Sequence, residues 1–223
     1  MWAFFYTCIF VVGAWLPLVV CHWRLHGVVN WLQVALTLFN AVNLMICLWE
    51  NALFLHRDHI RATYEGFKKK FGNRRFPTPV CFFEDITLGQ ALSYKYWSII
   101  WSTYSLLDPS YSSQTSFGFW IDTGNGITTL LPTALLSVAV TWDVTAWVSV
   151  RALGVVGLVV NYQMLYGTVL YFSNYCLNGY YKKTAWEYVA MVCVANGIWV
   201  FFPGAWMWAC WDMIMTDSLQ LFR

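Results

Sequence analysis

Apolar residues along the chain gather into long runs, and the lengths of these runs predict the fold. A helix needs roughly 20 apolar residues to cross the hydrocarbon core of a bilayer. Five stretches reach that length, at about residues 3–21, 30–55, 118–141, 148–172 and 187–210. The pattern predicts an all-α integral membrane protein in which five transmembrane helices form one bundle, with residues 1–223 as a single domain.

Residues 91–107, ALSYKYWSIIWSTYSLL, show a different pattern, because Tyr, Trp and Ser alternate with aliphatic residues. This mixture suits a helix that lies at the membrane interface better than one that crosses the bilayer. We therefore expect a basic loop and an interfacial helix over residues 56–107, before the third span. A sixth span here would reverse the orientation of every later helix.

The first run begins at Trp2 without a basic leader, and no small-x-small cleavage site follows it in LVVCHWRLHG. We expect a retained anchor rather than a signal peptide. With five spans, ten of the thirteen Lys and Arg residues lie on the side of the N-terminus, residues 56–107 and the loop around Lys182 and Lys183. The positive-inside rule makes that side cytosolic and the side of the C-terminus lumenal.

Composition supports a membrane class, since 59% of the residues are hydrophobic and only 11% are charged. The seven cysteines form no CxxC pair, and the four histidines have no carboxylate or cysteine grouping that predicts a metal site. No nucleotide-binding glycine motif or GxSxG elbow is present. We therefore expect no metal, no other cofactor and no nucleic-acid partner. The basic run FKKKFGNRR at 67–75 would attract anionic lipid, although a solvated loop is the simpler interpretation.

Two carboxyl groups, Glu50 and Asp122, fall within the second and third apolar runs. An ionisable side chain costs about 3 kcal/mol at the bilayer centre on insertion scales, so such residues face the bundle interior and often mark a function. Two structural alternatives stay open. Glu50 could reach headgroup water from the end of its span, and Asp122 could cap a helix that starts at Thr123.

Other polar and aromatic residues on the last two spans are candidates for the same interior. Asn196 and Trp199 share a helical face at a spacing of three residues, and Tyr162, Gln163 and Tyr166 lie on the fourth span. Buried amides often only join transmembrane helices. Aromatic residues make up 20% of the chain, more than two interfacial belts require, so some of them line the interior. Ring faces there would stabilise a passing positive charge, with bulky packing as the alternative.

Three blocks of residues are NYQMLYGTVLYF at 161–172, NGIWVFFPG at 196–204 and WSTYSLLDPSY at 101–111. They resemble the EXPERA superfamily, the sterol-isomerase-like membrane proteins that include the emopamil-binding proteins. The blocks at 161–172 and 196–204 are similar to its fourth and fifth spans in residue type and order. Glu50 and Asp122 fall where that family has acids. The block WSTYSLLDPSY is similar to the family in the spacing of Trp101, Tyr104, Asp108 and Tyr111.

The resemblance covers about residues 30–212 and implies a five-helix endoplasmic-reticulum protein with a cavity open toward the membrane. Its best known enzyme moves a sterol ring double bond by protonation and deprotonation, and other members bind sterols or drugs. This chain departs from the pattern at Ile46, where the family has a histidine one turn before the acid, and DPSY at 108–111 lacks the family arginine. Some thirty extra residues also separate Glu50 from Asp108.

A carboxyl group held away from water stays protonated more readily and can protonate an alkene or an epoxide. We take Asp122 as the leading proton donor, Glu50 as its partner and Asn196 as the group that orients one of them. The remaining candidates are expected to bind substrate, and they are Trp199, Tyr162, Gln163, Tyr166, Asp108, Tyr111 and Trp101.

Because the histidine is missing, the sequence favours an integral membrane terpene cyclase that acts on a farnesyl-type meroterpenoid alkene or epoxide. A sterol double-bond isomerase is the second hypothesis, and a non-catalytic sterol or lipid-binding protein is the third. The expected partners are a hydrophobic isoprenoid or sterol substrate and membrane lipid, and a homodimer is compatible with the sequence.

Overall fold

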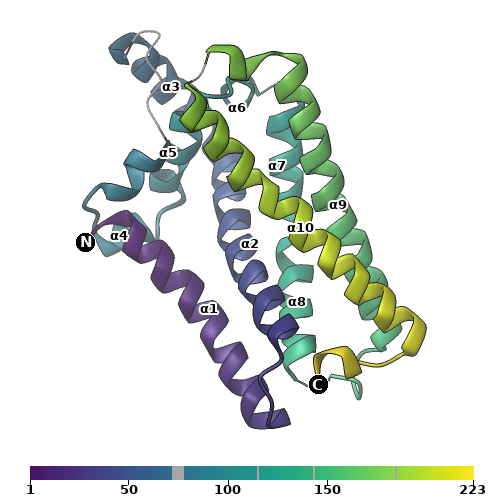
Figure 1. The fold of residues 1–223 in the computed structure, drawn as a ribbon. Coiled ribbons are helices and arrows are strands. Elements are labelled where there is room, and N and C mark those ends of the chain that lie inside the picture. The colour runs from purple at the N-terminus through teal and green to yellow at the C-terminus, as the bar shows by residue number, and fades with distance from the viewer. Residues whose placement is uncertain (72–77, 115, 143, 184) are drawn as a thin grey trace.

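The computed structural model describes residues 1–71, 78–114, 116–142, 144–183 and 185–223. Long helices run through the length of the molecule, and shorter helices gather toward one end (Figure 1). In these described ranges four helices are long and apolar enough to cross a membrane, namely α1 (Ala3–His26), α2 (Trp31–Leu55), α9 (Val150–Leu177) and α10 (Trp186–Thr216). α1, α9 and α10 extend beyond the predicted apolar runs because the helices continue into residues such as Asn174 and Asp212.

A fifth candidate span is the pair α7 (Phe117–Thr128) and α8 (Leu130–Thr141), which meet at a bend of 45°. Pro132 explains the bend, because it has no backbone N–H and its ring would clash with the carbonyl of Thr128, four residues earlier. The predicted all-α class is confirmed for the described residues. They provide four helices that could cross a membrane, or five when the bent pair counts as one span, which is compatible with a multi-pass membrane protein.

The segment between α2 and α7 forms short helices near one end of the bundle (Figure 1). They are α3 (Arg57–Phe71), the 3-10 helix η1 (Thr78–Phe83), α4 (Leu88–Ala91), α5 (Tyr94–Tyr104) and α6 (Ser110–Ser113). α5 occupies most of the predicted interfacial helix. It is anchored to α2 by Trp101, whose indole N–H donates to the Trp49 carbonyl at 2.6 Å.

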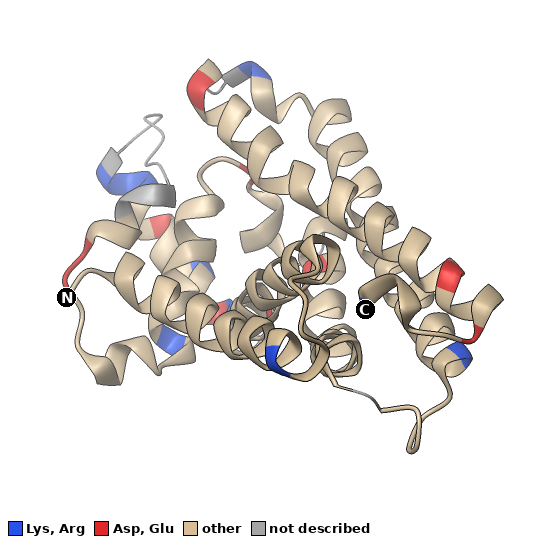
Figure 2. Ribbon diagram, turned by 60° about the horizontal axis from the view of Figure 1, so that its bottom comes forward, with Lys and Arg blue, Asp and Glu red and all other residues tan. Residues whose placement is uncertain are grey.

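Charged residues are sparse along the long helices (Figure 2). The last turn of α3 carries Lys68, Lys69 and Lys70, which belong to the predicted basic run 67–75. Residues 72–75 of that run lie outside the described residues. A second short 3-10 helix, η2 (Tyr180–Lys183), links α9 to α10 at the same end of the bundle.

A ladder of polar side chains joins α2 to the bent pair α7–α8. In lipid a buried polar group has no water to bond, so each one needs a protein partner. The contacts span 2.8 to 3.3 Å and pair Gln33 with Thr141, Asn40 with Ser137, Asn43 with Thr133, Cys47 with Thr129 and Asn51 with the Gly126 carbonyl. Interhelical hydrogen bonds in membranes contribute about 0.6 to 2 kcal/mol each, so the ladder fixes how α2 and α7–α8 are aligned.

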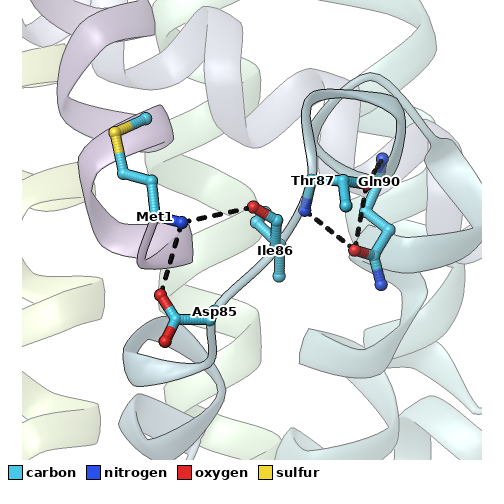
Figure 3. A network of polar contacts seen from close by, with 5 residues as sticks. All are labelled: Met1, Asp85, Ile86, Thr87 and Gln90. Atoms are coloured by element: carbon cyan, nitrogen blue, oxygen red, sulfur yellow. Dashed lines mark hydrogen bonds and ion pairs between the residues drawn. The ribbon is translucent and has the colours of Figure 1, made fainter.

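The start of α1 is tied to the segment before α4 (Figure 3). The Met1 ammonium lies 3.3 Å from an Asp85 carboxylate oxygen and donates to the Ile86 carbonyl at 3.5 Å. Asp85 is 77% exposed, so this ion pair contributes less than about 1 kcal/mol. Its consequence is positional, because it sets α4 beside the point where α1 begins.

The other end of the bundle is closed by the C-terminal 3-10 helix η3 (Gln220–Phe222). His22 and the Phe222 carbonyl form a 2.6 Å hydrogen bond, and the Asn30 amide donates to the Leu221 carbonyl at 3.0 Å. Arg223 donates to the Val140 carbonyl at 3.2 Å. The chain terminus therefore joins α1, α2 and α8.

The bent pair can be tested by its effect on topology. If α7–α8 crosses the membrane as one span, the chain crosses five times and its two termini lie on opposite sides. Acceptor sites for N-glycosylation, introduced before Met1, at Gly179 and after Arg223, would report lumenal exposure. We expect only the C-terminal site to be modified, and the same state at both termini would mean that the bent pair does not cross.

Candidate functional site

A cavity of about 310 Å³ lies between α2, α5, α6, α7, α9 and α10. Most of its wall is apolar, with several aromatic rings. Its polar atoms belong to two acids, two amides, phenols and one threonine. Prominent lining residues are Ile46, Trp49, Glu50, Trp101, Tyr104, Tyr111, Asp122, Asn125, Thr168, Tyr171, Asn196 and Trp199.

The two carboxyl groups reach this cavity from α2 and α7 and lie close enough for their charges to interact. Glu50 is only 6% exposed, so it does not reach headgroup water as the structural alternative required. Its Oε2 atom is buried and has no hydrogen-bond partner among the residues that the structure describes. Asp122 lies in the middle of α7, and Ser116 caps that helix, so a capping role for Asp122 is excluded.

Gly126 explains how the two acids come together. A Cβ atom at this position would lie 2.6 Å from Cβ of Glu50 and 3.1 Å from the Cys47 carbonyl oxygen. The missing side chain lets the α7 backbone approach α2 at the level of Glu50. Asp122 lies four residues before Gly126 and therefore projects from the same face of α7.

Asn196 and Trp199 also face the cavity, as their shared helical face predicted. The Asn196 amide donates to the Tyr104 hydroxyl at 3.4 Å and to the Val192 carbonyl at 2.8 Å. Its contact is thus with a phenol, which corrects the expectation that it orients a carboxyl group. The Trp199 indole N–H donates to Asn43 Oδ1 at 3.0 Å, so the polar ladder fixes this ring.

Two phenols, Tyr104 and Tyr171, complete the polar part of the wall, and their hydroxyl oxygens are 2.6 Å apart. Neither was among the predicted site residues. Tyr171 lies three and four residues after Thr168 and Gly167, which also line the cavity, so these residues mark the face of α9 that points inward.

The structure places Tyr162 and Tyr166 outside the cavity, contrary to the prediction that they form its wall. They are 55% and 51% exposed, and they stack on each other on the outer face of α9 with ring centroids 5.8 Å apart. Gln163 is not in the lining either. Its amide donates to Asn125 Oδ1 at 2.9 Å, and Asn125 does line the cavity.

The predicted residues of the block at 101–111 divide into two groups. Trp101 and Tyr111 line the cavity and stack with centroids 5.1 Å apart. Asp108 is fully buried outside the lining, where its Oδ1 accepts from the Ser110 backbone N–H at 3.0 Å. Burial raises the pKa of Asp108, although the hydrogen bonds from Ser110 oppose this shift. Asp108 therefore supports the wall and does not contact a ligand in the cavity.

Comparisons with protein-family models, with curated proteins and with solved structures found no match to this chain. Within the described ranges, no three His, Cys, Asp or Glu side chains cluster in a way that could hold a metal ion.

The close approach at Gly126 predicts a difference between two glycines of the same helix. Alanine at Gly126 would overpack α7 against Glu50, at a cost of about 1–3 kcal/mol. Gly124→Ala is the matched control, since a Cβ there meets nothing within 4 Å. We expect thermal unfolding in detergent to show a lower midpoint for Gly126→Ala only. Equal midpoints would contradict the packing of α7 on α2 described above.

Proposed function

We propose that the protein is an integral membrane terpene cyclase. It protonates a farnesyl-type isoprenoid, as an alkene or as a terminal epoxide on an aromatic or polyketide head, and cyclises it through a carbocation. The observation that carries this proposal is the pair of acids, buried Glu50 and half-buried Asp122, at one cavity walled by aromatic rings.

The acid pair supports a role in proton transfer. Two neighbouring carboxyl groups in a buried site do not both ionise readily, so the pair holds a proton that it can donate. Asp122 donates this proton to the substrate. Glu50 then shares or restores the proton, and its unpartnered Oε2 is a position that can hold it.

The wall suits the cation that follows. Protonation generates a carbocation, a double bond of the chain attacks it to form a ring carbon–carbon bond, and a neighbouring carbon finally loses a proton to the carboxylate left behind. An alkene substrate is thereby isomerised, and an epoxide becomes an alcohol. The rings of Trp101, Tyr111 and Trp199 offer faces that stabilise positive charge, and their apolar packing keeps water from capturing it.

Ile46 favours cyclisation over sterol isomerisation. It lines the cavity one turn before Glu50, at the position where the sterol-isomerase pattern has a histidine. A proton relay through imidazole cannot form there. The same hypothesis includes five spans, a cytosolic N-terminus and residence in the endoplasmic-reticulum membrane.

The substrate class can be tested with microsomes that contain the protein. They would be given a prenylated phenol, its terminal epoxide and, separately, a sterol whose ring double bond has not been shifted. We expect cyclised products from a prenylated substrate. Conversion of the sterol alone would replace the cyclase with an isomerase, and thermal stabilisation by sterol without turnover would indicate a binding protein.

The proposed role of the acid pair predicts that replacing either carboxyl group by an amide lowers turnover. Asp122→Asn keeps the side-chain size but cannot donate a carboxylic proton, so we expect turnover to fall by roughly 100-fold or more. Glu50→Gln should also reduce turnover. Asp212→Asn, on α10 outside the cavity lining, is the control and should keep full activity. Full turnover by a folded Asp122→Asn variant would exclude Asp122 as the donor.

A further inference from the structure

A second cavity, of about 320 Å³, lies between α3, α4 and α5. It is separate from the first one, because α5 turns Ile99 toward it and turns Ile100 and Trp101 toward the acid-containing cavity. We call it the α5 cleft and define it by its lining, which consists of His59, Thr63, Gln90, Ser93, Lys95, Tyr96 and Ile99.

The α5 cleft contains one lysine, Lys95, whose ammonium supplies a positive charge. Lys95 forms no ion pair with any residue in the described part of the chain. Burial lowers the pKa of His59, and the charges of Lys95 and His56 lower it further. No carboxyl group is in the lining. Glu84 interacts with Tyr96 from outside it, and the Asp58 carboxylate accepts a hydrogen bond from Gln114 at 3.4 Å.

The polar groups of the cleft are suited to donate hydrogen bonds. The Gln90 side-chain oxygen already accepts from the Thr87 backbone N–H at 2.9 Å and from the Thr87 hydroxyl at 3.1 Å, which leaves its amide N–H groups for another acceptor (Figure 3). The Ser93 oxygen accepts from the Tyr96 backbone N–H at 3.4 Å, so its hydroxyl hydrogen is available as well. An oxyanion with several acceptor oxygens matches this set.

Three exposed apolar residues flank the lining residues Gln90 and Ser93 along the chain, and we call them the apolar ledge. Leu88 begins α4, Leu92 follows its last residue, and the two are 61% and 79% exposed, while Tyr94 is 41% exposed. The Met1 contacts with Asp85 and Ile86 hold this ledge beside the start of the candidate span α1. A donor-lined cleft next to exposed leucines and to the start of a candidate span matches a molecule with a phosphate group and acyl chains.

We propose that the α5 cleft binds the phosphate headgroup of an anionic membrane phospholipid. Lys95 and the Gln90 amide contact the phosphate, and the acyl chains follow Leu88 and Leu92. This inference does not depend on the proposed cyclase activity, since none of these residues lines the acid-containing cavity.

The test is thermal unfolding of the detergent-purified protein during titration with phosphatidic acid, phosphatidylcholine or glycerol 3-phosphate. We expect phosphatidic acid to raise the midpoint saturably and more than phosphatidylcholine does. Lys95→Gln should weaken the apparent affinity about fivefold, the effect of one basic residue near a membrane surface. Lys182→Gln is the matched control, because Lys182 is exposed at the same end of the bundle but lies outside the cleft.

Three results would overturn the proposal. Equal stabilisation by glycerol 3-phosphate would assign the cleft to a free phosphate ester. Equal losses in Lys95→Gln and Lys182→Gln would indicate unspecific attraction to the basic end. No stabilisation by any of the three compounds would mean that the cleft is not a phosphate site. The Gln90 side chain is exposed, so Gln90→Ala removes its amide contact to the phosphate without changing the charge of the cleft. This variant should also weaken the apparent affinity for phosphatidic acid.

Discussion

The alignment of α2 with α7–α8 by paired polar side chains is the constraint on which the rest of the structure depends. In a bilayer these groups have no water to bond, so sliding α2 along α7–α8 would leave buried polar groups without hydrogen-bond partners and would cost free energy. A slip of one residue would turn Asp122 by about 100° around the axis of α7 and away from Glu50. The ladder that holds the helices together therefore also holds the two acids at one cavity.

The same ladder extends to the aromatic wall. Asn43 donates to Thr133 on α8 and accepts from the Trp199 indole on α10, so one amide connects three helices. Gly126 brings α7 against α2, whereas the rings of Trp199, Trp101 and Tyr111 line the cavity from α10, α5 and α6. Small residues on one side and rigid rings on the other explain why a cavity persists beside tightly packed helices.

The sequence predicted the membrane class and the segments that form the long helices, because run length is a strong signal in a bilayer. It also selected Glu50, Asp122, Asn196 and Trp199, which the fold brings to one cavity. Their catalytic roles stay predictions. The inward face of α9 could not be predicted, since apolar and aromatic residues surround this helix on all sides and leave no periodicity to follow. We therefore predicted that Tyr162 and Tyr166 line the cavity, whereas Gly167, Thr168 and Tyr171 are the residues of α9 that line it.

The depth of the cavity bears on the kind of molecule that suits it. Glu50 lies five residues before the end of α2 and Asp122 five residues after the start of α7, which places both acids about 7.5 Å from helix ends. Both acids thus lie nearer to the end of the bundle formed by the C-terminus of α2 and the N-terminus of α7 than to its other end. Under the proposed function, the chain of an isoprenoid would occupy the aromatic part of the cavity. A polar head attached to that chain would extend toward the nearer end of the bundle, and this is the reason for proposing a meroterpenoid.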